Sequence, residues 1–166
     1  MIVPDANLLL YAYDSNSDQQ PMAGRWLQEI FTGTDTVGLS WLSIGAFLRI
    51  ATNSRLGRSQ LSMNSAINIV DEWLGMRAVR LIVPGEGHWV TLKEMLIAGR
   101  VQGPVTTDAQ LAALTIEHGA ILHTTDRDFA RFPGLRWTVK ISIGAKYNAG
   151  ARVLTVIRSG LKAIED

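Results

Sequence analysis

The stretch MIVPDANLLLYAY, residues 1–13, predicts a short strand that passes directly into a helix. Residues 1–3 form an apolar, β-like run, and residues 8–13 have the character of the first turns of a helix. Asp5 lies between the two. Ligands bind at the carboxyl ends of the strands in open α/β sheets, so Asp5 is the first candidate for a functional residue.

The rest of the chain continues the alternation of strands and helices. Further strands are expected at residues 36–39, 79–83, 120–124 and 135–139, and helices at 21–31, 40–50, 61–74, 89–98 and 108–118. Ser40 suits an N-cap and Gly119 a C′ position. Residues 101–107, which include Gly103-Pro104, are expected to form a loop. This alternation predicts an α/β domain with parallel strand pairing and right-handed crossovers.

Apolar spacing indicates which side chains enter the core. In the helix expected at 61–74, the predicted buried stripe is Ile67, Val70 and Leu74, with Trp73 beside it. Four tryptophans occupy apolar positions and are predicted to be core residues rather than platforms for base stacking: Trp26, Trp41, Trp73 and Trp137.

Two more aspartates lie at element boundaries, Asp108 at the start of a helix and Asp126 after a strand. With Asp5 they are expected to converge on one crevice. Grouped carboxylates repel one another, and they are hard oxygen ligands suited to magnesium or manganese. The sequence therefore favours a divalent-metal site and phosphodiester chemistry. The competing interpretation is capping, because an aspartate at a helix start also accepts hydrogen bonds from free backbone amides.

Composition limits the classes of function. The chain has 166 residues, no cysteine and a net charge of +1, which suit one domain without disulfides or thiolate metal sites. No apolar stretch approaches the roughly 18 to 20 residues that cross a bilayer, so we expect no membrane association and a cytoplasmic location. Residues 1–135 hold 10 Lys and Arg against 13 Asp and Glu, whereas residues 136–166 hold 6 against 2. Charge alone thus gives no argument for nucleic acid.

Several motifs occur together in order along residues 1–137: DANLLLY (5–11), Trp41 followed by FLRIATN (47–53), DAQLAAL (108–114), EHGA (117–120) and TDRDFARFPGLRW (125–137). In residue types and spacing, this set resembles the PIN-domain ribonuclease toxins of VapBC toxin–antitoxin systems. The resemblance implies a three-layer α/β/α domain, here residues 1–139, around a central parallel sheet of four to five strands. It also implies a magnesium- or manganese-dependent endoribonuclease whose partners are an RNA substrate, a small VapB-type antitoxin and a second copy of the chain.

The resemblance assigns roles by position. Asp5, Asp108 and Asp126 match the catalytic acids that hold the metal, and Asp128 matches an accessory acid near a second metal position. The supporting polar neighbours are Asn7, Thr107 and Thr125. Arg49, Arg55 and Arg58 are candidate RNA phosphate contacts, because an arginine can hold a phosphate with two hydrogen bonds; a solvated helix end is the competing interpretation.

Three features depart from the family pattern. Ala46 occupies a position where many members have a glutamate, which predicts a weaker metal site. Gln110 stands where a histidine is frequent. Residues 140–166 have no counterpart, and their stripe of Val153, Ile157, Leu161 and Ile164 is compatible with a docked helix or with a disordered tail.

Two other functions remain open at the level of sequence. A PIN domain without catalytic activity would bind RNA or a protein partner, which the loss of a carboxylate at Ala46 favours. A phosphatase with an aspartate nucleophile normally has a second aspartate two residues later, whereas this chain has Asn7. The three histidines have no zinc-site spacing.

Overall fold

The computed structural model describes residues 1–54 and 60–139, and its sheet confirms the predicted fold class. Five parallel strands lie in the order β3-β2-β1-β4-β5. Their bounds are β1 Ile2–Pro4, β2 Val37–Ser40, β3 Val79–Ile82, β4 Ile121–His123 and β5 Trp137–Thr138. Along the chain, β2 and β3 are added on one side of β1, and β4 and β5 follow on its other side.

The order of the strands places a switch point between β1 and β4. The two strands run in register, with Ile2 opposite Ile121 and Pro4 opposite His123. The connections after β1 and after β4 leave in opposite directions along the sheet, which opens a crevice at the carboxyl ends of these strands. Asp5 directly follows β1 and therefore lies at that crevice.

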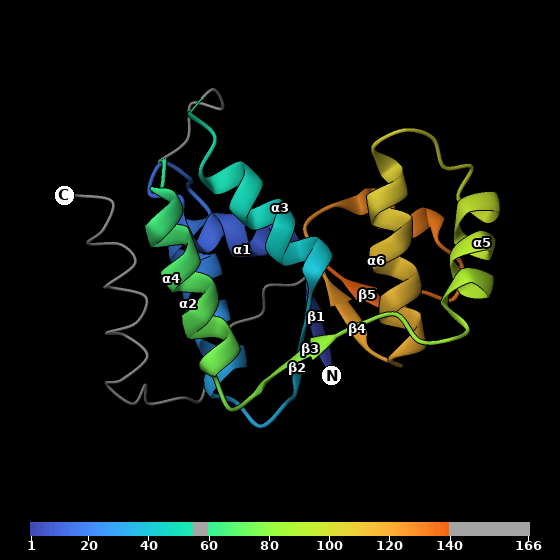
Figure 1. Cartoon of the computed structure of the whole chain (residues 1–166), viewed down its shortest axis with the longest axis horizontal. Helices are drawn as coiled ribbons and strands as arrows, with labels where there is room; N and C mark the ends of the chain where they lie inside the picture. Colours follow the sequence, from blue (N-terminus) through green and yellow to red (C-terminus); the bar gives the residue numbers. More distant parts are fainter. Residues whose placement is uncertain (55–59, 140–166) are drawn as a thin grey trace.

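Helices cover both faces of the sheet and make a three-layer domain (Figure 1). One layer holds α1 Ala6–Tyr13, α2 Gln20–Thr32, α3 Trp41–Ala51 and α4 Met63–Gly75. The opposite layer holds α5 His88–Ala98 and α6 Val105–Glu117. Each layer has its own apolar core against the sheet, one around Leu9, Phe47 and Trp73 and one around Ala112, Leu122 and Phe129.

The predicted helix ends at Ser40 and Gly119 are confirmed. The Ser40 hydroxyl accepts a hydrogen bond of 3.0 Å from the Ser43 amide, so β2 passes into α3 without a loop. Gly119 follows α6 with a φ of +56°, a conformation that costs glycine little. It allows the chain to turn at once into β4.

The start of α6 was predicted wrongly. Residues 105–107, expected in a loop, form the first turn of this helix. Pro104 precedes them with a φ of −59°, which suits a helix start because the proline ring fixes that angle. Asp108 therefore lies at the end of the first turn rather than at the first residue of the helix.

The buried face of α4 also differs from the prediction. Ile67 and Leu74 are exposed, at 44% and 38%, while Ala66, Ile69, Val70 and Trp73 are buried. The indole of Trp73 determines this orientation, because its N–H donates a buried 3.0 Å hydrogen bond to the Tyr13 hydroxyl. The ring also packs on Phe47, with a centroid separation of 4.6 Å. Trp73 is the largest side chain of α4 and carries an N–H that needs a partner, so its burial sets which face of the helix meets the core.

The tryptophan prediction holds for Trp26 and Trp73, which are buried, and Trp137 is half-buried. For Trp41 it was wrong, since this side chain is 57% exposed. Trp41 is the first residue of α3, and the cap by Ser40 directs Ser43 and Ile44 inward instead.

Some predictions fall outside the described residues. Arg55, Arg58 and the extension 140–166 lie there, so the docked-helix and tail interpretations stay predictions. Within residues 1–54 and 60–139, no helix has the length and apolarity to cross a membrane.

Candidate active site

Asp5 is held by a residue from the neighbouring strand. Its Oδ2 accepts a 2.7 Å hydrogen bond from the Thr124 hydroxyl, and its backbone amide donates to the His123 carbonyl at 2.9 Å. The side chain is only 8% exposed, and it makes no capping hydrogen bond to α1. The amides of Ala6 and Asn7 still favour the charged form of its carboxylate, so the helix start contributes to the position of Asp5 beside the Thr124 contact.

Asp126 is linked to Asp5 through the same threonine. The Thr124 hydroxyl oxygen accepts a 3.0 Å hydrogen bond from the Asp126 amide while its proton goes to Asp5. Asp126 Oδ1 in turn accepts a 2.8 Å hydrogen bond from the Asp128 amide and caps the 3₁₀ helix Arg127–Arg131. Capping thus explains part of the role of Asp126, and the cap also fixes where its carboxylate lies.

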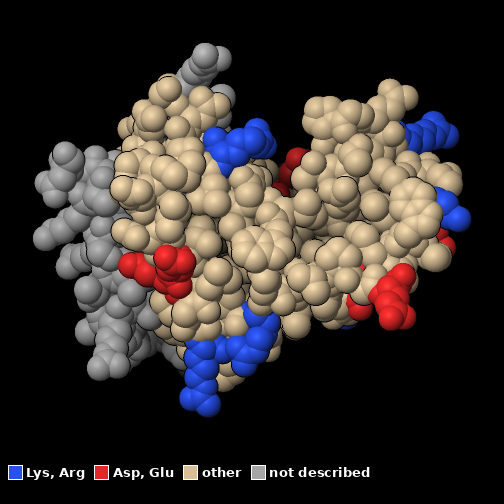
Figure 2. All heavy atoms as spheres, in the orientation of Figure 1, with Lys and Arg blue, Asp and Glu red and all other residues tan. Residues whose placement is uncertain are grey.

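Asp108 reaches the same place from α6 in the opposite layer. It lines a cavity of about 240 Å³ together with Asp5 and Asp126. In Figure 2 acidic atoms lie in a hollow between the two helical layers, with basic atoms on its rim. All three carboxylates line this cavity, although Asp5 is more than a hundred residues away in the sequence from the other two.

Burial and mutual repulsion raise the pKa values of two of these acids. Desolvation is the largest cause of the raised pKa of Asp5; the charge of Asp126 adds to it, and the Thr124 hydrogen bond opposes it. For Asp108, burial together with the charges of Asp5, Asp126 and Asp128 raises the pKa to about 6. The site therefore resists holding its full negative charge without a cation.

The donor set fits a hydrated magnesium or manganese ion. As placed, no three acidic or imidazole side chains of the described chain surround a single point closely enough to ligate one ion by themselves. Mg²⁺ usually keeps several waters and is held by one or two carboxylates, which Asp5, Asp108 and Asp126 can supply. Burial raises the pKa of Asp108 most, and the charges of Asp5, Asp126 and Asp128 add to it; such an ion would offset the repulsion among these acids.

The other predicted site residues divide into two groups. Asn7, Thr107 and Arg49 line the cavity, as does Ala46, so no carboxylate enters from that side of α3. Asp128 and Thr125 do not line it. Asp128 is exposed and pairs with Arg131 at 3.6 Å, and its charge still acts on Asp108.

Two site residues were missed. Thr124, not Thr125, contacts the acids. It follows the end of β4, and its hydroxyl accepts from the amide two residues later, a turn that threonine commonly forms. Ser43 lines the cavity, and its hydroxyl donates a 3.0 Å hydrogen bond to the Pro4 carbonyl. Nothing in the sequence distinguished Ser43 from an ordinary residue near the helix start.

A parallel sheet whose β1–β4 crevice holds three carboxylates defines a class of acidic nuclease-like site, and comparison with known proteins identifies the family. Residues 2–135 match the family model of the PIN domain, and the chain belongs to this family. Ribonuclease VapC33 of Mycobacterium tuberculosis is 41% identical over 138 residues, covering 83% of this chain and 96% of that protein. Ribonuclease VapC37 of the same organism is 38% identical over 137 residues, covering 82% and 95%.

Solved structures agree on the fold. VapBC2 from Rickettsia felis, bound to a DNA fragment from its promoter, has a TM-score of 0.60 and 17% identity over 83% of this chain and 98% of that one. Mycobacterium tuberculosis VapC20, described as a sarcin-ricin loop cleaving toxin, has a TM-score of 0.59 and 18% identity over 82% and 99%. At these identities the likeness concerns the fold alone. The resemblance found in the sequence is confirmed at the level of the family.

Proposed function

We propose that this protein is an endoribonuclease of the VapC type that acts as the toxin of a toxin–antitoxin pair. The observation that carries the proposal is the convergence of Asp5, Asp108 and Asp126 on one cavity at the β1–β4 crevice. The relatives named ribonuclease VapC match nearly their whole length to this chain, which supports the same activity here.

The side chains of this chain prepare the site in distinct ways. Asp5, Asp108 and Asp126 would hold the divalent cation, and Thr124 keeps Asp5 and the Asp126 backbone in fixed positions. Arg49, exposed on the wall of the cavity, is placed to bind an RNA phosphate. A cation bound there supplies Lewis acidity and offsets the charge that develops on the phosphoryl oxygens.

PIN ribonucleases generally depend on a metal, and we propose Mg²⁺ or Mn²⁺ for this one because the donors are carboxylate oxygens. We further propose a small VapB-type antitoxin as the inhibitor, in line with the VapBC assemblies among the structural relatives. We also propose a homodimer, which the resemblance supports, and a cytoplasmic location, which suits an RNA substrate. Asp128 is proposed as an accessory acid that acts through its charge on Asp108.

The test is cleavage of a mixed cellular RNA pool by the purified full chain. We expect cleavage with Mn²⁺ or Mg²⁺, none with EDTA, and none with Asp5→Asn, which removes a charge while keeping the shape of the side chain. Asp71→Asn is the matched control, because Asp71 is exposed on α4 and does not line the cavity. Undiminished cleavage by Asp5→Asn would exclude the proposed site.

A PIN domain that binds RNA without cutting it is the second candidate, and Ala46 favours it. The cavity has no carboxylate at this position of α3. This alternative predicts metal-independent RNA binding and intact RNA under every condition. Measuring binding and cleavage on the same RNA pool separates the two functions.

A further inference from the structure

The exposed Trp41 lines a second cavity. This cavity measures about 320 Å³ and lies between the start of α3, the end of β3 and the helices α5 and α6. Ile82, Leu92 and Leu114 supply buried apolar walls. The volume is at the lower end of the range for small-molecule sites, which suits one flat ring system better than a folded chain.

The second cavity adjoins the carboxylate cavity. Leu42 lines both, and on α6 Leu111 lines the first while Leu114, three residues later, lines the second. Residues three apart on a helix are surface neighbours, about 5–6 Å between their Cβ atoms. The two cavities are therefore neighbours along α6 and the start of α3.

Two polar side chains belong to the walls of this apolar space. Gln110 is half-buried and offers an amide donor and an amide acceptor. His88 Nδ1 lies 2.9 Å from Glu117 Oε2, which in the neutral imidazole assigns the proton to Nδ1 and leaves Nε2 as an acceptor. Side chains of this kind can form hydrogen bonds with the edge of a nucleobase.

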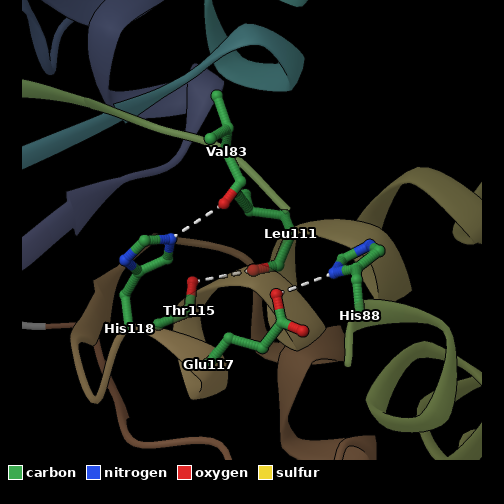
Figure 3. A network of polar contacts seen from close by, with 6 residues as sticks. All are labelled: Val83, His88, Leu111, Thr115, Glu117 and His118. Atoms are coloured by element: carbon green, nitrogen blue, oxygen red, sulfur yellow. Dashed lines mark hydrogen bonds and ion pairs between the residues drawn. The ribbon is translucent and has the colours of Figure 1, made fainter. Parts of the chain in front are cut away.

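The last turns of α6 hold the walls in place (Figure 3). Glu117 fixes His88 at the start of α5, and His118 Nε2 lies 3.1 Å from the Val83 carbonyl, between the lining residues Ile82 and Pro84. Side chains of one helix thus tie down both β3 and α5 around the cavity. A site formed before the ligand arrives loses less free energy on binding.

We propose that this second cavity is a subsite for an unpaired nucleobase next to the scissile phosphate, with Trp41 as its stacking surface and Gln110 and His88 as readers of its edge. The inference rests on the proposed ribonuclease function and adds that the substrate is single-stranded at this position. Exposed aromatic side chains that stack bases are the common device for binding single-stranded RNA. The continuity with the carboxylate cavity favours a nucleobase over a second copy of the chain as the occupant.

The first experiment uses the ¹⁵N-labelled full chain and follows the indole N–H signals. The probes are the four nucleoside 5′-monophosphates, with ribose 5-phosphate as the base-free control. Trp41 is assigned by the signal that disappears in Trp41→Phe. We expect at least one of the four nucleotides to shift the Trp41 signal, ribose 5-phosphate to leave it in place, and the signal of Trp89, 63% exposed but outside the cavity, to stay unchanged.

The second experiment measures cleavage kinetics on single-stranded RNA. Trp41→Ala should raise KM roughly 5- to 150-fold, the range that the loss of one stacked base predicts, whereas Trp41→Phe should retain most of the affinity. Gln110→Ala should change the base preference next to the cut, and Trp89→Ala is the matched control with no expected change.

The outcomes separate this inference from the proposed function. A Trp41 signal that moves with protein concentration but not with nucleotides, together with dissociation of a dimer by Trp41→Ala, would assign the cavity to a second copy and overturn the subsite. Cleavage that requires Asp5 but is indifferent to Trp41 would leave the nuclease standing and exclude the subsite. Nucleotide-dependent shifts without cleavage in any sample would overturn both the nuclease and the place of the subsite beside a scissile phosphate, and would leave only a base-binding cavity.

Discussion

The hydroxyl of Thr124 donates a 2.7 Å hydrogen bond to Asp5 Oδ2 across 119 positions of the sequence. The same oxygen accepts from the Asp126 amide, so one buried threonine fixes two of the three carboxylate positions. Such contacts orient ligands and tune their charge, and they matter to a metal site nearly as much as the ligands themselves.

Thr124→Val should therefore reduce activity while preserving shape. We expect a loss of about 10- to 100-fold in activity or metal affinity, the usual cost of removing a partner of a ligand. The Thr124 hydrogen bond opposes the raised pKa of Asp5, so its loss should move the acidic limb of the pH–activity profile to higher pH. Thr124→Ser keeps the hydroxyl and serves as the control; equal profiles for the Val and Ser variants would contradict the role.

The pKa of Asp108 predicts how stability depends on pH without metal. Its pKa is about 6 in the folded chain against an ordinary value of 3.8, so the folded state holds this proton more tightly than the unfolded state. The contribution to stability is full below about pH 4, declines as the pH rises through about 6, and is lost above it. Thermal unfolding in EDTA should show this decline for the natural chain and a smaller one for Asp108→Asn.

The same repulsion predicts when a cation stabilises the protein. Added Mg²⁺ should raise the Tm more at pH 7.5 than at pH 5, because the carboxylates are ionised at the higher pH. Asp71→Asn should retain this difference, since Asp71 is exposed and outside the cavity. An Mg²⁺ effect that is equal at both pH values would contradict binding by these acids.

Ala46→Glu should strengthen the metal site. A carboxylate at this wall of the cavity adds a hard ligand, so we expect half-maximal activity at a lower Mn²⁺ concentration and a lower Tm in EDTA from added repulsion. Ala46→Gln has nearly the same volume without the charge and should change neither. A similar response to Glu and Gln would show that volume, not charge, matters here.

Arg49→Ala should weaken RNA binding equally for all sequences. Loss of one phosphate contact to a single strand reduces the salt slope of log Kobs by about 0.7. Arg77→Ala is the control, because Arg77 is also exposed but does not line the cavity. Titration of RNA binding at several salt concentrations measures both slopes, and an unchanged slope for Arg49→Ala would remove this residue from the RNA path.

Tyr13→Phe tests the core and leaves the site alone. In the natural chain the buried Trp73 N–H donates a 3.0 Å hydrogen bond to the Tyr13 hydroxyl. The variant leaves this N–H without its partner, so we expect a loss of about 1–3 kcal/mol in the free energy of unfolding. Activity of the folded protein should not change. Urea unfolding measures the effect, with Tyr11→Phe as a half-buried comparison.

Local rules in the sequence were sufficient for much of the fold and part of the site. Strand and helix order, the cap at Ser40 and the turn at Gly119 follow from residues that act on their immediate neighbours. Asp5 and Asp126 were proposed as site residues because parallel topology brings the carboxyl ends of strands together, and Asp108 because a helix start can point into the same crevice. The buried face of α4 and the burial of Trp41 were predicted wrongly, because each depends on which of several apolar side chains packs best against the core.

What the sequence determined by itself is therefore the α/β fold, the family, and the candidacy of Asp5, Asp108 and Asp126, because hydrophobic period, turn chemistry and motif order are local properties. Only the tertiary structure decided that Thr124 rather than Thr125 supports the acids, that Asp128 lies outside the cavity, and that Trp41 faces a second cavity. The physical reason is that a distance of 2.7 Å between residues 119 positions apart, or the exposure of one indole, results from the packing of two helical layers on one sheet.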